Sequence, residues 1–424
     1  MRPETARETA LGTATATADA LVATARHLAE TRFAGRAATW DRTREYCWQN
    51  VEEMAEAGLM GMSIPVAQGG RGASFLTVCR VVEELARHCT LTARIAVEAN
   101  MGGISAVMAY GTEAQKALCA PIVLAGDKPA ICITEPGAGS AASEMQTIAR
   151  RVKGGFRLTG TKHWITGGGV SRLHLVFARV LDEAGREEGI GGFLVLANPR
   201  ADAYPVGFTV VRRERTMGLC GMPEAELRFE DVFVSDEMAL NPPSGFARGF
   251  AELMTAYNSQ RVGAGTIAMG VAAGALSRAT DYLKEREQFG RPLAEFQGLQ
   301  WMLADMDTGV EASRMMLHAA AASAETSGTG FPDKTMAARA KLFASETAIK
   351  VVNDALQMFG ARGYADQEPI ERMARDVRMF TIGGGTAQVL RTQIAGSALG
   401  MKTPQTRDGY TRLAEAAALR TAAE

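Results

Sequence analysis

The chain has 424 residues, and its 46 lysines and arginines nearly balance its 47 aspartates and glutamates, which gives a formal net charge of −1. This length predicts two or three structural units with a large buried core, and the balanced charge disfavours a nucleic-acid-binding protein, which gathers basic residues on one face. The sequence contains no stretch of about 18 uncharged apolar residues, which a membrane span would need. The first residues lack the apolar segment of a secretory signal. We therefore expect a cytoplasmic protein that binds neither nucleic acid nor membranes.

Cysteine and histidine spacing indicates neither disulfides nor a metal site. The six cysteines are scattered without a CxxC pair, and the five histidines show no HxxxH spacing. We expect no disulfide framework and no bound metal ion.

Apolar residues at helical spacing mark the first part of the chain, from about residue 17 to 125. Leu85, Cys89, Ala93 and Ala96 follow one another at steps of three and four, which is typical of a helix with one buried face. This pattern predicts an N-terminal helical domain over residues 1–130.

Short β-branched or aromatic runs replace this pattern between about residues 130 and 240. Residues 173–180, 190–197 and 225–234 are such runs, and the last alternates apolar and charged residues as a half-buried strand does. No helical pattern separates them, so we expect an antiparallel sandwich or barrel over residues 131–244.

The helical pattern returns from Gly245 onward and predicts a helical bundle over residues 245–400. A second helix is expected from about Gln297, and a third from Asp333 to Phe359, where the following Gly360 suits a helix C-cap. The remaining residues, 401–424, form a tail with an Ala-rich segment that predicts a surface helix.

Two segments near the middle of the chain have the composition of ligand-binding loops. Residues 131–140 end in a Gly-rich stretch whose free N–H groups could hold a pyrophosphate, although an ordinary turn has the same composition. In residues 160–169, Trp164 and Thr166 share one side of a short strand that ends in three glycines. Trp164 could cover a flat ring system, but a tryptophan buried in the core is the usual explanation.

Two later segments are equally open to two interpretations. Residues 286–297 combine Arg286 and Phe289 before a Gly-Arg-Pro turn, which suits either a phosphate contact or a polar helix connection. Residues 382–391 place three glycines before Thr386, which suits either an anion site or a helix start capped by that threonine.

Taken in this order, TEPGAGS, KHWITGG, REQFGRPLAEFQ, QMFGARGY and GGGTAQ resemble the acyl-CoA dehydrogenase superfamily over roughly residues 20–400. The resemblance implies an α+β multidomain fold with an N-terminal helical domain, a middle β domain and a C-terminal four-helix bundle. It also implies non-covalent FAD, an acyl-CoA thioester substrate and a homotetramer built as a dimer of dimers.

The resemblance assigns site residues position by position. Those matching FAD contacts are Ile133, Thr134, Ser140, Trp164, Ile165, Thr166, Arg286, Phe289, Gln297, Gln357, Gly360, Ala361, Thr386 and Gln388, several of them across a subunit interface. Those matching acyl-CoA contacts are Ser140, Asn258, Arg261 and Gly385.

This sequence departs from the family at the catalytic base. Most family members carry a glutamate where this chain has Gly384, and a minority carry it where this chain has Gln260. Neither glycine nor a neutral amide accepts a proton, and a general base is worth about 10²–10⁴-fold in rate. Loss of both carboxylates should therefore nearly silence α,β-desaturation.

Arg94 stands in the run LTARIAVEAN, which aligns with the wall of the acyl pocket. Its guanidinium suits a carboxylate or sulfinate at the end of a short acyl chain. An i,i+4 ion pair with Glu98 on a solvated helix face is the alternative.

A pocket with FAD, CoA, a distal anion clamp and no base resembles one branch, the 3-sulfinopropionyl-CoA desulfinases, which release sulfite and leave propionyl-CoA without net oxidation. In this hypothesis Arg94 orients the sulfinate, Gln260 hydrogen-bonds near the reacting carbons, and Gly384 leaves room where a glutamate would repel an anion. Two alternatives stay open: a short-chain or dicarboxylyl-CoA dehydrogenase with a relocated base, which passes electrons to an electron-transfer flavoprotein, and a non-catalytic acyl-CoA and FAD binding protein.

Overall fold

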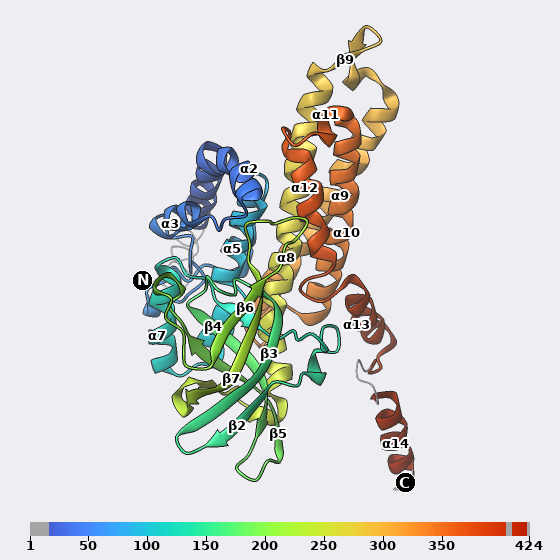
Figure 1. Cartoon of the computed structure of the whole chain (residues 1–424). Coiled ribbons are helices and arrows are strands. Elements are labelled where there is room, and N and C mark those ends of the chain that lie inside the picture. The colour runs from blue at the N-terminus through green and yellow to red at the C-terminus, as the bar shows by residue number, and fades with distance from the viewer. Residues whose placement is uncertain (1–16, 404–408, 422–424) are drawn as a thin grey trace, which may run out of the picture.

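The computed structural model describes residues 17–403 and 409–421, in which helices, then strands, then helices follow one another (Figure 1). This order confirms the predicted fold. Residues 17–28 are helical and continue through a π-helical turn at Ala29–Phe33. The N-terminal helices that follow are α2 (Ala34–Thr43), α3 (Trp48–Glu56), α4 (Phe75–Ala86), α5 (Thr90–Asn100), α6 (Gly103–Tyr110) and α7 (Glu113–Leu124).

The middle part of the chain forms one eight-stranded sheet in the order β6-β7-β3-β2-β4-β5-β8, with β1 paired to β4. Its inner face encloses a separate apolar core that includes Phe156, Val176 and Phe229. The strands are β1 (Ala130–Cys132), β2 (Ile148–Val152), β3 (Gly155–Thr166), β4 (Leu173–Leu181), β5 (Glu187–Leu196), β6 (Phe208–Arg213), β7 (Glu224–Ser235) and β8 (Ala239–Leu240).

The sheet is not wholly antiparallel, which corrects one expectation. Both β1 and β2 run parallel to β4, at different positions along it, whereas the other strand pairs of this sheet are antiparallel. The chain therefore leaves the edge of β4 after β1 and returns to it at β2, and the Gly-rich loop lies between these two points. Strand runs in the sequence do not carry this information, because direction is set by the connections.

The C-terminal helices pack lengthwise, as predicted. Asp333 caps α10 by accepting hydrogen bonds from the amides of Thr335 and Met336 at 2.9 and 2.8 Å, and Gly360 ends that helix with a φ of 61°. The helices are α8 (Gly245–Glu285), α9 (Gln297–Ala322), α10 (Lys334–Phe359), α11 (Ala361–Tyr364), α12 (Pro369–Val377) and α13 (Ala387–Leu399), with the small hairpin β9 (Glu287–Gln288) and β10 (Arg291–Pro292) after α8.

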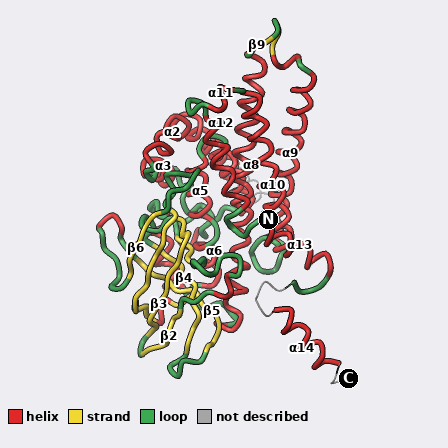
Figure 2. Tube along the Cα trace, turned by 45° about the vertical axis from the view of Figure 1, so that its right-hand side comes forward, coloured by secondary structure: helices red, strands yellow, loops and turns green. Residues whose placement is uncertain are grey.

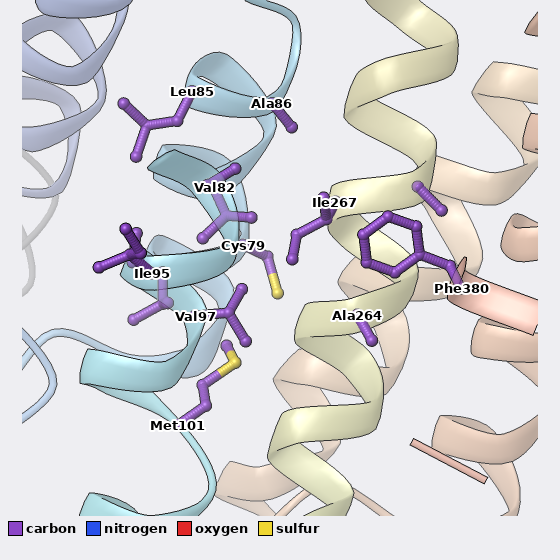
Figure 3. Packing of buried hydrophobic residues seen from close by; sticks show 14 of the residues in the cluster. Cys79, Val82, Leu85, Ala86, Ile95, Val97, Met101, Ala264, Ile267 and Phe380 are labelled. Atoms are coloured by element: carbon purple, nitrogen blue, oxygen red, sulfur yellow. The ribbon is translucent and has the colours of Figure 1, made fainter. Parts of the chain in front are cut away.

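Helix α8 is the centre of the molecule. By length and composition it could cross a membrane, with a mean hydropathy of 1.2 over its most apolar window, but 83% of that window is buried against the rest of the protein. Figure 3 shows apolar side chains of α4 and α5, among them Val82 and Val97, facing Ile267 of α8. A Cβ at Gly263 would lie 2.6 Å from Cγ1 of Val97, so only glycine permits this close approach of α5 to α8.

The tail contains the predicted helix, α14 (Gly409–Thr421). Both views show α14 apart from the bundle and the sheet (Figures 1 and 2). Figure 2 also shows the strands gathered beside the N-terminal helices, while α8, α9 and α10 extend away from them.

Candidate active site

The loop between β1 and β2 is anchored by a buried ion pair. Nζ of Lys162 donates to Oε1 of Glu135 at 2.8 Å and to the carbonyl oxygen of Ile133 at 3.0 Å. Burial lowers the pKa of Lys162. Burial acts to raise the pKa of Glu135, but Lys162 and the neighbouring hydrogen bonds hold it below its usual value. Both groups therefore stay charged, and the pair fixes the base of the loop to β3.

The outer side of this loop is open. A Cβ at Gly137 or Gly139 would meet no atom within 4 Å, and Ser140 is exposed. Thr134, whose carbonyl oxygen accepts from the amide of His163 at 2.8 Å, is only partly buried. The loop thus offers hydroxyls and accessible backbone to a ligand, as a pyrophosphate or flavin site requires.

We expect Lys162→Met to destabilise this loop strongly. The change would leave the Glu135 carboxylate buried without its cation, a loss of about 3–5 kcal/mol for a broken buried pair. The apparent unfolding temperature and the flavin retained on purification should both fall. Lys153→Met, at an exposed position of the β2–β3 turn, is the control. Equal flavin content in the two variants would contradict the role assigned to the pair.

Trp164 lies on the surface, not in the core that its residue type suggested. The β3–β7 register shifts between Lys162 and Ile165, and Trp164 adopts a φ of 58° there. This bulge turns its ring outward, so that 53% of the residue is exposed and the ring stacks on His163 with centroids 4.7 Å apart. The strand is also longer than predicted, since it begins at Gly155.

Ile165 does not share that orientation. Its side chain is 1% exposed and belongs to the core of the sheet, so only its backbone can contact a ligand. Exposed Trp164, partly buried Thr166 and the open loop together fit one edge and face of a flat ring system such as a flavin.

The residues expected to hold the adenine dinucleotide lie elsewhere. They occupy the end of the bundle marked by β9 and α11, far from the sheet (Figure 1). All are exposed, and Phe289 is 93% exposed. Within one chain they form a second group, separate from Trp164, which suits the expectation that they act across a subunit interface. They are Arg286, Phe289, Gln297, Gln357, Gly360 and Ala361.

Arg94 lies in a buried cluster of charged and polar groups. Its Nη2 is 2.7 Å from Oε1 of Glu98 and 3.4 Å from Oγ1 of Thr166. Lys128 forms an ion pair with the other oxygen of Glu98 and donates to the carbonyl oxygen of Thr166 at 3.0 Å. Nε2 of Gln260 donates to Oε1 of Glu98 at 3.4 Å. The ion pair of Arg94 with Glu98 exists, but on a buried face and not the solvated one considered above.

Two polar atoms of this cluster lack partners. Nε of Arg94 and Oε1 of Gln260 are buried and form no hydrogen bond. An unsatisfied buried polar atom costs about 1–3 kcal/mol, more when the group is charged. A donor and an acceptor left open on either side of Glu98 are what a bound anion or thioester would complete.

Glu224 is the second carboxylate of this region. It pairs with Thr166 across the ladder of β3 and β7, and both of its oxygens lie 2.9 Å from the Thr166 hydroxyl. Burial raises the pKa of Glu224 to about 7, and Arg94 only partly offsets that effect. Glu224 therefore carries a proton for part of the time at neutral pH.

The predicted CoA contacts meet the glycine loop beside α13. Nη1 of Arg261 donates to Oδ1 of Asn258 at 2.7 Å, and its Nε donates to the carbonyl oxygen of Gly384 at 3.3 Å. Lys341, fully buried on α10, donates to the carbonyl oxygen of Gly385 at 2.7 Å. Burial lowers the pKa of Lys341 to about 7.

The end of this loop forms the capped helix start, one of the two interpretations that the sequence left open. Oγ1 of Thr386 accepts from the amide of Val389 at 3.1 Å and caps α13, while Gln388 is exposed. Gly384 has a φ of 72°, and a Cβ there would meet nothing closer than 3.9 Å. Backbone conformation, and not a lack of space, is what favours glycine at this position.

Carboxylates from other parts of the chain were not predicted from the sequence to lie at this site. The structure brings Glu98 beside Gln260 and Glu224 beside Thr166. Both oxygens of Glu98 are paired, one with Arg94 and the other with Lys128. Lys128 and Lys341 were not predicted either. The only sequence signal for them was a charged residue inside an apolar run.

One group in the described part of the chain has metal-ligand composition. His163, Glu214 and Glu226 place a nitrogen and two carboxylate oxygens within 4.8 Å of one another. Arg212 already forms ion pairs with both carboxylates, at 2.7 and 2.8 Å, so a cation is present without a metal. The expectation of no metal ion stays a prediction.

Comparison with known proteins adds three family matches. The N-terminal, middle and C-terminal domains of acyl-CoA dehydrogenase match residues 15–127, 130–232 and 247–399. A 3-sulfinopropanoyl-CoA desulfinase of Variovorax paradoxus is 56% identical over 394 residues, 93% of this chain and 97% of the relative. A benzylmalonyl-CoA dehydrogenase of Aromatoleum aromaticum is 37% identical, over 86% of this chain and 93% of the relative.

A solved structure shares the whole architecture. Butyryl-CoA dehydrogenase from Megasphaera elsdenii superposes with a TM-score of 0.83 at 31% identity, over 90% of this chain and 98% of that one.

Proposed function

Because the chain belongs to the acyl-CoA dehydrogenase family, we propose that it is a 3-sulfinopropanoyl-CoA desulfinase, which releases sulfite and leaves propionyl-CoA without net oxidation. The relative with that name is similar over nearly the full length of both chains. The desulfinase and the benzylmalonyl-CoA dehydrogenase belong to one family, so the choice between them depends on the site.

One observation carries the proposal: Arg94 is a buried arginine with an open Nε, in a chain that has no carboxylate at either position of the family's base. Arg94 offers a permanent charge and a fork of donors, which match the oxygens of a sulfinate. Gly384 and Gln260 occupy the two positions of the family base, and neither accepts a proton. A site that clamps a distal anion but removes no α-proton suits cleavage of a C–S bond.

The chain's own residues then have separate roles. Arg94 holds the sulfinate, and Glu98 and Lys128 fix the position of Arg94 through the buried pairs. Gln260 presents Oε1 to the substrate near the reacting carbons. Ser140, Asn258, Arg261 and Gly385 would hold the thioester and the CoA arm.

FAD would be held without a covalent bond by the residues assigned to it above, with the adenine contacts supplied by a neighbouring subunit. When bound, it would supply a flat, electron-accepting ring. The open loop beyond Glu135 and the exposed face of Trp164 support this assignment.

An anaerobic assay tests the proposed function. We expect the wild-type holoprotein to release sulfite from 3-sulfinopropanoyl-CoA while the visible absorption band of the flavin stays unchanged. Butyryl-CoA, which has the same thioester but no distal anion, should neither react nor bleach the flavin. Bleaching by a short acyl-CoA, with no sulfite released, would refute the desulfinase.

A dehydrogenase with a relocated base is the second candidate, because Nε2 of Gln260 lies only 3.4 Å from a carboxylate oxygen of Glu98. In that case electrons would pass to an electron-transfer flavoprotein, and the same assay would show bleaching. A protein that binds CoA esters tightly and gives neither result would be a non-catalytic binding protein.

We also propose a cytoplasmic homotetramer, built as a dimer of dimers. The six adenine contacts are exposed at an end of the bundle remote from Trp164, so one chain does not gather both halves of the FAD site. Sedimentation equilibrium of the holoprotein measures the assembly.

A further inference from the structure

The proposed reaction needs a proton donor as well as an anion clamp. Sulfite leaves as the C–S bond breaks, and a C–H bond must form on the same carbon to give propionyl-CoA. No redox partner is involved, but a proton has to reach the β-carbon. The inference below rests on the proposed function and concerns the source of that proton.

The Thr166 hydroxyl is a proton-carrying group beside the Arg94 guanidinium, and therefore near the expected position of this carbon. Nη2 of Arg94 lies 3.4 Å from Oγ1 of Thr166. A sulfinate oxygen bound to this guanidinium lies about 2.8 Å from it, and the β-carbon is only two bonds beyond that oxygen. Thr166 is therefore within reach of the carbon that loses sulfur.

Glu224 stands directly behind that hydroxyl. Its two carboxyl oxygens are each 2.9 Å from Oγ1 of Thr166. A carboxyl group, a hydroxyl group and the guanidinium thus form one continuous line from β7 to α5. A hydroxyl in that position can give its proton to one side and receive another from the other side.

We propose that Glu224 supplies, through the Thr166 hydroxyl, the proton that replaces the sulfinate group on the β-carbon. The C–S bond breaks, and its electron pair takes the Thr166 proton to form the C–H bond. The Glu224 proton moves to Oγ1 of Thr166 in the same step. Sulfur dioxide leaves and adds water to give bisulfite and a proton, which restores Glu224. Substrate and water thus give propionyl-CoA and bisulfite.

Substrate binding favours the protonated form of Glu224. The charged groups that face it are Arg94 and Glu98 of α5 and Lys128 before β1, while Tyr257 of α8 is the other titratable neighbour. When Glu224 is ionised, the two positive charges of Arg94 and Lys128 balance the two negative charges of Glu98 and Glu224. A sulfinate beside Arg94 adds a negative charge, which disfavours a second anion on Glu224 and raises its pKa further above about 7. Binding of the substrate therefore favours protonation of the group that donates the proton.

Lys341 is the competing donor. Burial lowers its pKa to about 7, and an arriving anion would also favour its protonated form. Its Nζ, however, is directed to the carbonyl oxygen of Gly385, and Arg94 is its neighbour only through electrostatics. The geometry favours Glu224.

Proton uptake on ligand binding distinguishes Glu224 from Lys341 as the proton donor, and it can be measured without turnover. Succinyl-CoA carries a carboxylate in place of the sulfinate and cannot lose sulfite. Just above pH 7, where free Glu224 is partly ionised, binding of succinyl-CoA to the wild-type holoprotein should take up protons, measured with an indicator dye or as the pH dependence of Kd. Below the pKa of Glu224 the uptake should vanish, because the group is already protonated.

Glu224→Gln should abolish this uptake and slow sulfite release by about 10²–10⁴-fold, the usual value of general acid catalysis. Glu224→Asp, which keeps a carboxyl group, should retain the uptake. Glu230→Gln on the exposed face of β7 is the matched control and should behave as the wild type. Thermal melting and flavin content check that each variant is folded.

Uptake and turnover that survive Glu224→Gln would overturn the inference, as would loss of uptake in Lys341→Met with Glu224 intact. Sulfite release by the wild-type protein is read separately. If it is absent, the proposed function fails whatever the proton measurement shows. If it is present and Glu224→Gln has no effect, only the inference fails.

Discussion

Arg94→Ala is expected to abolish sulfite release while FAD stays bound. Truncating one partner of a buried, hydrogen-bonded charge pair costs about 2–5 kcal/mol, which corresponds to about 30- to 4000-fold in binding. The affinity for succinyl-CoA should fall within this range, because its carboxylate occupies the same clamp. Affinity for butyryl-CoA should change little, since that ester has no distal anion. Sulfite assay and calorimetric titration measure the two effects.

Arg94→Lys is the control for charge without the planar fork. A lysine keeps the positive charge near Glu98 but cannot form the bidentate contact, so we expect intermediate affinity and slow turnover. Unchanged sulfite release in Arg94→Ala would remove Arg94 from the mechanism. Equal losses of affinity for succinyl-CoA and butyryl-CoA would show that the change damages the pocket and not the clamp.

Gly384→Glu is expected to introduce α,β-desaturation, the reaction that the wild-type protein should nearly lack. The new carboxylate would stand where most family members carry their base, and a general base contributes about 10²–10⁴-fold. Anaerobic butyryl-CoA should then bleach the flavin, a response that we do not expect of the wild-type protein. Sulfite release should slow, because a second anion opposes the sulfinate. The open surroundings of a Cβ at this position, with no atom closer than 3.9 Å, leave room for the side chain.

Gly384→Gln is the matched control. Both variants share the strain of a side chain at a φ of 72°, about 1–2 kcal/mol, but the amide cannot accept a proton. Bleaching in the glutamate variant alone identifies the carboxylate as the cause. The same flavin response in both variants, or in neither, would show that Gly384 does not mark the position of the base.

Much of the fold could be predicted from local patterns. Asp333 and Gly360 mark the two ends of α10, because a capping carboxylate and a left-handed glycine act on the nearest turns. Alternation along β7 predicted its two faces, because successive side chains of a strand point in opposite directions. The parallel pairing of β1 and β2 with β4 was not predicted, since it depends on how the chain between them leaves the sheet and returns.

The candidate site, like the fold, could be predicted only in part from the sequence. Arg94, Gln260 and Gly384 were identified by their residue types at family positions. The exposure of Trp164 agrees with the resemblance and not with its residue type, because a bulge turns the ring outward.

By itself the sequence determined the order of helices and strands, the absence of a glutamate at positions 260 and 384, and the presence of an arginine in an apolar run. Only the tertiary structure decided that Arg94, Glu98, Lys128 and Gln260 meet in one buried cluster, and that Glu224 stands behind Thr166. Propensities and caps act over one or two turns, whereas these groups come from α5, β3, β7 and α8. Packing alone brings them together, and burial, which shifts the pKa of Glu224, exists only once that packing is complete.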